Sequence, residues 1–197
     1  MNNFRAKYRY LNSVTGVIIA LCVALFVITT FFPGVGNWLY YYGPLAKIEP
    51  YRFVSSAFMH SGLFHLVFNM LALFMLGEQL EKMMGTWRYL LLFFGSVIVG
   101  NLASSVFPMF LGGVEVPVVG ASGGIFGLFG AMLVISRKIE ANSSGILVLL
   151  GINFIYGIMY PNISWESHIG GFLGGAVITA VLWKLAQLQN RRRRRRG

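Results

Sequence analysis

The sequence predicts an all-α fold that crosses a membrane several times. Hydrophobic residues make up 56% of the 197 residues and charged residues only 11%, whereas soluble domains carry about 25% charged residues. The six acidic residues are all Glu, which is too little acidic surface for a soluble protein of this length. The single cysteine excludes a disulfide-rich secreted domain. The apolar runs are continuous, which excludes the alternating strands of a membrane β-barrel.

Six apolar runs are candidates for transmembrane helices, which need about 20 apolar residues, or fewer where non-helical backbone completes the crossing. They cover residues 15–32, 62–76, 89–107, 122–136, 145–160 and 167–188. We therefore predict a six-transmembrane-helix bundle over residues 15–188, between an N-terminal segment at 1–14 and a basic tail at 189–197.

The basic residues predict the orientation, because cytoplasmic loops of membrane proteins are enriched in Lys and Arg. With a cytoplasmic N-terminus, all sixteen Lys and Arg residues except Lys47 and Arg52 lie inside. Both termini are then cytoplasmic. We interpret the arginine run from Arg191 to Arg196 as a topology signal and an anchor for anionic lipid. RNA or an acidic groove of a partner protein are the alternatives, but no other feature of the sequence indicates binding to nucleic acid.

Polar residues occur within three of the predicted spans, where they are costly and therefore indicate function. His65 and Asn69 lie in the second span, with His60 just before it. Ser122 opens the fourth span and His168 opens the sixth. All three histidines of the chain belong to this set.

The helical rise places these residues at one depth. Ser122 lies 15 residues before Arg137, and His168 lies 16 residues before Lys184. At 1.5 Å per residue they stand roughly 22 to 24 Å above the inner boundary. In a hydrocarbon core about 30 Å thick, both lie several Å below the outer surface.

Glycines predict that the fourth and sixth spans touch, because small residues four positions apart let helix backbones approach closely in lipid. The pairs are Gly123 with Gly127, Gly170 with Gly174, and Gly171 with Gly175. Because the fourth span is short, the residues before it, 117–120, are expected to be non-helical backbone at membrane depth. Such backbone is tolerated only where it is buried in protein or lines a water-filled cavity.

A serine beside a histidine, with amide donors nearby, is the minimal set for acyl transfer. Ser122 would attack a carbonyl and His168 would accept and return its proton. Asn69, His65 and the Ser122 N–H would stabilise the oxyanion. We expect a dyad, since the chain has no Asp, and Glu166 lies only two residues from His168, where helical side chains do not face each other.

Other interpretations of these residues stay open at this point. The serine and the histidines are also found in purely structural roles, and three His with an Asn are potential metal ligands. Neither Asp nor Cys lies near them, and the sequence lacks His-Glu-x-x-His. A transporter would also place polar groups at mid-depth, but the chain shows no repeated halves with matching broken helices.

Three motifs in order resemble the rhomboid family of intramembrane serine proteases, in its bacterial six-helix form. The resemblance covers about residues 49–175. In chain order, the first motif is His60 with His65 and Asn69. The second is Gly120-Ala121-Ser122-Gly123, and the third is His168 with Gly171 and Gly175.

The resemblance implies hydrolysis of a peptide bond in or beside a transmembrane helix of a single-span or polytopic membrane protein, in the bacterial plasma membrane. It gives Ser122 and His168 the catalytic roles and Asn69 and His65 the oxyanion site. The supporting residues are His60, Gly120, Gly123 and Phe126, the last standing where many members carry a Tyr. Neither a cofactor nor a metal is implied. The alternative is a non-catalytic rhomboid-like scaffold that binds client transmembrane helices.

Overall fold

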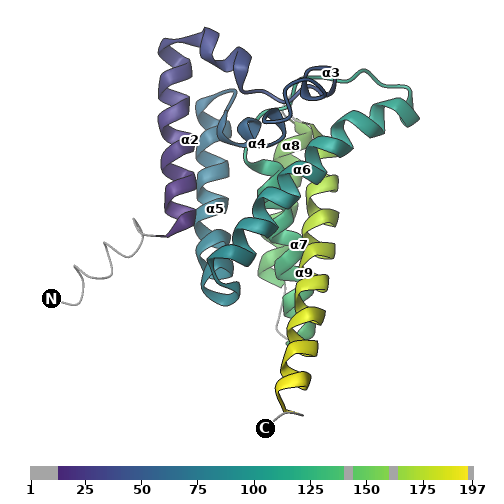
Figure 1. Cartoon of the computed structure of the whole chain (residues 1–197). Helices are drawn as coiled ribbons and strands as arrows, with labels where there is room; N and C mark the ends of the chain where they lie inside the picture. Colours follow the sequence, from purple (N-terminus) through teal and green to yellow (C-terminus); the bar gives the residue numbers. More distant parts are fainter. Residues whose placement is uncertain (1–12, 140–143, 160–163, 195–197) are drawn as a thin grey trace, which may run out of the picture.

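The computed structural model describes residues 13–139, 144–159 and 164–194. Within these ranges the chain is helical and forms no β-sheet, which confirms the predicted all-α class. Six long helices stand side by side (Figure 1). They are α2 (Val14–Phe31), α5 (Leu63–Met84), α6 (Thr86–Leu111), α7 (Ser122–Lys138), α8 (Ser144–Met159) and α9 (Trp165–Arg194). Between α2 and α5 lie four short helices: η1 (Pro33–Trp38), α3 (Gly43–Ala46), α4 (Arg52–Ser55) and η2 (Ser56–Phe58).

Four of the long helices, α2, α5, α6 and α9, are long and apolar enough to cross a membrane. The chain is thus a polytopic membrane protein. With 17 and 16 residues, α7 and α8 are shorter, so the count of six spans stays a prediction. Several helices extend beyond the apolar runs; α5, for example, continues through Glu78 and Lys82, which form an ion pair of 2.9 Å across one helical turn.

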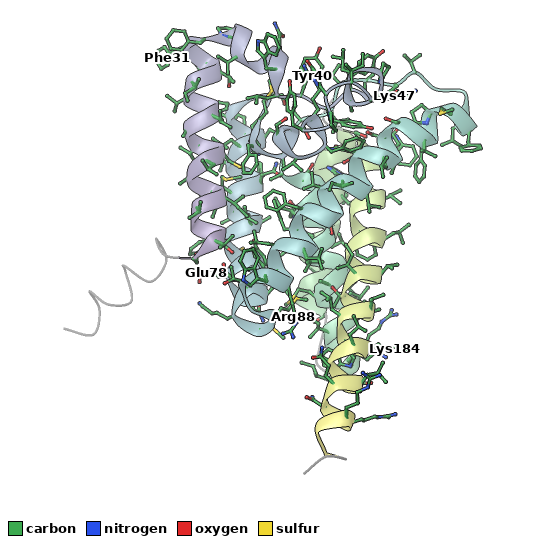
Figure 2. The ribbon with its side chains drawn as sticks, in the orientation of Figure 1. Phe31, Tyr40, Lys47, Glu78, Arg88 and Lys184 are labelled. Carbon is green, nitrogen blue, oxygen red and sulfur yellow. The ribbon has the colours of Figure 1, made fainter. Side chains whose placement is uncertain are left out.

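Consecutive long helices run in alternating directions. Charged residues at the ends that the sequence analysis predicts to be cytoplasmic therefore lie at the same end of the bundle. Glu78, Arg88 and Lys184 lie at the lower end in Figure 2, and Phe31 and Lys47 lie at the upper end. This arrangement agrees with the predicted alternation of loops.

The centre of the bundle is α7, which contacts α5, α6, α8 and α9. Twelve of its 17 residues are buried. A helix that is apolar on every side must be surrounded by other elements. The position of α7 therefore fixes where its first residue, Ser122, lies in the fold.

Glycines allow α7 and α9 to meet backbone to backbone, as the sequence predicts. A methyl group added to Gly171 would overlap the carbonyl oxygen of Gly123, and one added to Gly175 would overlap that of Gly127. The second glycine pair of α9 faces α6 instead: an added methyl at Gly170 would meet Ala103 and the backbone of α6. One helix, α9, thus packs tightly against two neighbours through two glycine faces.

Glu81 joins the end of α5 to the start of α2. Its carboxylate accepts hydrogen bonds from the backbone N–H groups of Val14 and Thr15, both 3.0 Å, and from the Thr15 hydroxyl at 2.8 Å. A negative group at a helix N-terminus satisfies unpaired N–H groups and the helix dipole. Because Gly77 has no side chain, Thr15 packs directly against α5 there.

The connection between α2 and α5 is held by the buried side chain of Arg52. Its Nη1 donates to the carbonyl oxygens of Asn37 at 3.0 Å and Tyr40 at 2.9 Å, and its Nε pairs with Glu49 at 2.5 Å. The guanidinium also lies over the Tyr40 ring, 5.1 Å from its centre. One planar cation therefore organises the outer connection through several donors.

We predict that Gly175→Ala lowers the free energy of unfolding by about 1–3 kcal/mol, because the added methyl overpacks the contact between α7 and α9. The measurement is denaturant unfolding of the detergent-solubilised protein, followed by circular dichroism. Gly145→Ala is the matched control, since nothing lies within 4 Å of a methyl added there. Equal stability of the two variants would contradict the packing described above.

Candidate active site

Non-helical backbone leads into α7, as the sequence predicts for residues 117–120. Val118 exchanges two backbone hydrogen bonds with Tyr41, of 2.8 and 2.9 Å, and the N–H of Gly120 donates to the carbonyl of Ser56 at 2.9 Å. The segment before Ser122 is therefore tied to the connection between α2 and α5.

Partly buried polar groups hold this segment from the other side. Ser105 of α6 donates to the carboxylate of Glu115, which also accepts from the backbone N–H of Gly43 at 2.6 Å. Since the Ser105 proton is used in this bond, the Tyr41 hydroxyl is the donor in its 2.7 Å contact with Ser105. Burial raises the pKa of Tyr41, which keeps this donor protonated. Helix α6 and the outer connection thus set the place where α7 begins.

Ser122 is the first residue of α7, and no side chain caps that helix. The first N–H groups of a helix have no intrahelical partner, so they are free to bind an oxygen at this point. The Ser122 side chain is half-buried, whereas Ala121 before it and Gly123 after it are buried. The serine hydroxyl thus lies at a helix N-terminus, which is the positive end of the helix dipole.

A small cavity brings together the main residues singled out in the sequence. Ser122, His168, His65 and Asn69 all line it, and its volume is about 20 Å³. That volume holds about one water molecule. Three helices, α5, α7 and α9, supply these four polar side chains, as predicted from their depths.

His168 is buried and stacks on Phe126, one turn below Ser122. The two rings are nearly parallel, at 8°, with centroids 4.1 Å apart. In the part of the chain that the structure describes, neither ring nitrogen of His168 has a hydrogen-bond partner. The hydrogen bond expected between Ser122 and His168 is therefore not formed in this conformation, although both side chains face the same cavity.

His65 is oriented by its neighbours. Its Nδ1 lies 3.1 Å from the Ser61 hydroxyl, and the ring of His60 meets it edge-on with centroids 5.1 Å apart. When Nδ1 accepts the Ser61 proton, the imidazole carries its own proton on Nε2. That Nε2 is buried and has no partner among the described residues, so it is available as a donor to a bound group.

Asn69 lies one turn further along α5. Its amide nitrogen donates to the carbonyl of His65 at 2.8 Å, which fixes the side chain along the helix. The amide nitrogen has two protons and uses one of them here. Its Oδ1 is buried without a partner among the described residues.

Steric contacts explain why glycine stands at two positions of the motif around Ser122. Gly120 has a φ of +116°, which L side chains rarely adopt, and a methyl there would come 2.8 Å from two atoms of the His65 ring. Gly123 lies against Gly171 of α9, and a methyl on it would come 3.1 Å from the Ser167 hydroxyl. Both positions let the backbone around Ser122 approach its partners closely.

The cavity has further walls that the sequence analysis did not single out. Phe68, Ile125 and Asn153 also line it. Asn153 belongs to α8, whose other residues are mostly apolar. In the sequence Asn153 is a lone amide in an apolar run, and it belongs to none of the three motifs.

The arrangement lacks a carboxylate beside His168 in the described ranges. Glu166 instead accepts a hydrogen bond from the Ser164 hydroxyl at 2.8 Å, at the start of α9. It lies two residues before His168, and side chains two apart on a helix do not face each other. No group of three or more potential His, Cys, Asp or Glu metal ligands occurs among the described residues. The site is chemically a serine, an imidazole and several polar donors.

Comparison with known proteins decides the family. The Rhomboid domain model matches residues 47–185. The chain belongs to the rhomboid family. That stretch contains Ser122, His168 and the residues that line the cavity with them.

The match with this chain covers a different share of each rhomboid relative. Rhomboid protease GluP of Bacillus subtilis is 38% identical over 143 residues, which are 70% of this chain and 27% of GluP. YdcA of the same organism is 32% identical over 140 residues, 68% of each chain. Inactive RHOMBOID-like protein 8 of Arabidopsis thaliana is 32% identical over 133 residues, 64% of this chain and 36% of that one.

We predict that Gly120→Ala lowers the free energy of unfolding by about 1–3 kcal/mol, because it places a side chain in a strained backbone conformation and against His65. Thermal unfolding in detergent measures the change. Gly62→Ala is the control, since its added methyl has nothing within 4 Å. A Gly120→Ala protein as stable as this control would show that the close approach to His65 is not required.

Proposed function

We propose that this rhomboid-family protein is an intramembrane serine endopeptidase in which Ser122 and His168 form the catalytic dyad. The observation that carries the proposal is the shared cavity, which both Ser122 and His168 line. The serine stands at a helix N-terminus without a side-chain cap, and neither imidazole nitrogen has a partner among the described residues. Serine and histidine in one water-sized cavity are suited to acyl transfer followed by hydrolysis.

In the first step, the Ser122 oxygen attacks the carbonyl carbon of the scissile peptide bond while His168 accepts the hydroxyl proton. The tetrahedral intermediate then breaks its C–N bond, and His168 returns the proton to the leaving amine. A water molecule next attacks the acyl-enzyme ester, with His168 again accepting a proton. Collapse of this second intermediate gives the new carboxyl terminus and restores the Ser122 hydroxyl.

The oxyanion of each intermediate would be stabilised by donors of residues that line the cavity. These are the Ser122 N–H at the start of α7, the Nε2–H of His65 and the second amide proton of Asn69. Such donors stabilise the transition state more than the ground state. Phe126 supports His168 through the stacked ring contact, His60 supports His65, and Gly120 and Gly123 permit the close packing.

The proposed substrates are transmembrane helices of single-span or polytopic membrane proteins. A site below the outer surface is reached from the bilayer more readily than by a globular protein. Substrate helices with weak helix formers near their outer end would unwind at lower cost to expose a carbonyl. The cavity of about 20 Å³ admits a water molecule but not a peptide, so the walls must separate when a substrate binds.

We assign the protein to the bacterial plasma membrane because of its resemblance to the bacterial six-helix rhomboids. The distribution of Lys and Arg is the basis for placing both termini in the cytoplasm. In the structure α9 continues beyond Lys184 as a helix and carries Arg191 and Arg192. These arginines lie seven and eight residues past Lys184, a rise of roughly 10 to 12 Å. At that distance they lie next to the inner headgroups, where anionic lipid is the proposed partner of the tail.

The proposal is tested by labelling the detergent-solubilised protein with a fluorophosphonate and mapping the adduct by mass spectrometry. We predict an adduct on Ser122 that disappears in Ser122→Ala and His168→Ala. In Asn69→Ala, which removes one oxyanion donor, turnover of a membrane substrate falls by about 10²–10³.

Ser136→Ala is the matched control for the nucleophile. Ser136 is a buried serine of the same helix, and its hydroxyl donates to the backbone of Leu133 at 3.0 Å. Its replacement should leave labelling unchanged. Absence of an adduct in a protein with an intact thermal transition would contradict the dyad and favour a non-catalytic scaffold for client helices. One Arabidopsis thaliana relative is itself named inactive.

A further inference from the structure

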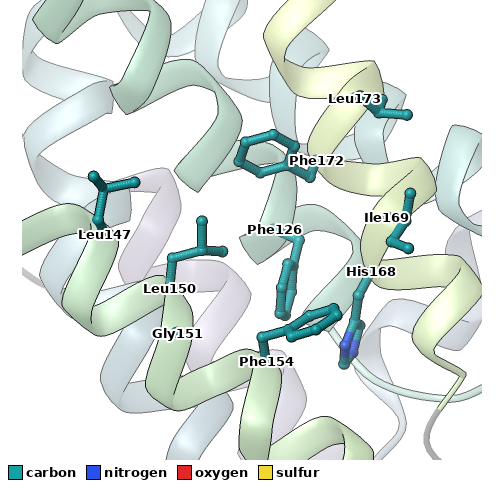
Figure 3. A pocket seen from close by; sticks show the side chains of 9 residues that line it. All are labelled: Phe126, Leu147, Leu150, Gly151, Phe154, His168, Ile169, Phe172 and Leu173. Atoms are coloured by element: carbon teal, nitrogen blue, oxygen red, sulfur yellow. The ribbon is translucent and has the colours of Figure 1, made fainter.

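A second, larger cavity lies beside the candidate active site. It is the α8–α9 groove, lined by Gly151 and Phe154 of α8, by His168, Phe172 and Leu173 of α9, and by Phe126 of α7 (Figure 3). Its volume is about 340 Å³, which is within the range of about 300–1,000 Å³ that ligand pockets have. His168 is the one polar side chain among the described residues that line it.

The groove opens sideways between two helices. Leu173 on α9 is 54% exposed and Leu147, at the other end on α8, is 49% exposed, whereas Phe126 and His168 are only 4% and 3% exposed. Leu173 lies 11 residues and His168 lies 16 residues before Lys184. The part of the groove formed by α9 therefore extends from roughly 16 to 24 Å above the inner boundary, within the hydrocarbon core of about 30 Å.

The size and chemistry of the groove select its occupant. A helix with its side chains is about 10–12 Å across and does not fit between Phe154 and Phe172 in a cavity of about 340 Å³. A lipid headgroup or a polar peptide would need partners for several polar groups, and the walls offer only one imidazole. A single hydrocarbon chain needs none, and the bilayer presents such chains at this depth.

We propose that the α8–α9 groove binds one acyl chain of a membrane lipid, with the chain lying against the stacked rings of Phe126 and His168. The bound chain fills the space behind the stack and so limits the movement of the His168 ring away from Ser122. The candidate base is thus held on one face by Phe126 and bordered by lipid. The chain is a positioning ligand and takes no part in the reaction.

The experiment uses the full chain in phosphatidylcholine vesicles that contain a phosphatidylcholine with a diazirine in the middle of one acyl chain. After illumination, peptide mass spectrometry maps the adducts. We expect adducts on groove residues such as Phe154 and Phe172. Adducts on Val17 and Leu21 of α2, which are 49% and 45% exposed, report contact with bulk lipid.

Gly151→Leu tests whether the groove itself holds the chain. A side chain at Gly151 meets nothing within 4 Å at its Cβ, so the leucine projects into the groove without a clash at its base. We expect the adducts on Phe154 and Phe172 to fall to background while those on α2 stay unchanged. Gly145→Leu, on the same helix and equally open at its Cβ, should keep the groove adducts.

Three results would overturn the proposal: groove adducts of equal yield in Gly151→Leu and in Gly145→Leu, adducts confined to α2 and other outer helix faces, or groove adducts that disappear when a membrane peptide is added. Gly151→Met, with a flexible side chain, repeats the test if Gly151→Leu does not fold. Labelling does not require catalysis, so Ser122→Ala must give the wild-type pattern. Failure of this proposal is therefore distinguishable from failure of the proposed protease activity.

Discussion

Direct backbone contact between α7 and α9 is the constraint on which the rest of the structure depends. In a bilayer the hydrophobic effect does not drive helices together, so close van der Waals packing must do so. Gly127 and Gly175 permit this packing in the lower part of the contact, and Gly123 and Gly171 permit it beside the site. Ser122 directly precedes Gly123, and His168 lies three residues before Gly171. The contact that stabilises the bundle therefore also sets the distance between the two candidate catalytic side chains.

At the end of the bundle where α7 begins, non-helical backbone must be held at the start of a buried helix. Unpaired backbone groups are costly away from water. Here they are paired by Tyr41 and Ser56, while Arg52 and Glu115 supply charged groups that each bind several partners. The result is an uncapped helix N-terminus beside a water-sized cavity. Stability is thus provided around the site, while both ring nitrogens of His168 and the Nε2 of His65 have no hydrogen-bond partner among the described residues.

The sequence was most informative where one chemical signal has one physical explanation. Continuous apolar runs predicted the helical membrane class, and the glycine pairs predicted the contact between α7 and α9. Helical rise placed Ser122 and His168 at one depth, and the structure brings them to one cavity with His65 and Asn69. What the sequence did not reveal depends on side-chain orientation and on neighbours distant along the chain. Examples are the participation of Asn153, the unformed hydrogen bond between Ser122 and His168, and the groove beneath the Phe126 ring.

We propose that the convergence of these helices creates a protease site within the membrane. Cleavage of a single-span reporter, with Gly residues near the outer end of its helix, tests this after reconstitution with the protein in liposomes. We expect one new carboxyl terminus within or next to the reporter's membrane helix, present with the wild-type protein and absent with Ser122→Ala. Equal cleavage by both proteins, or no cleavage of any such reporter by a folded wild-type protein whose Ser122 also resists a fluorophosphonate, would contradict it.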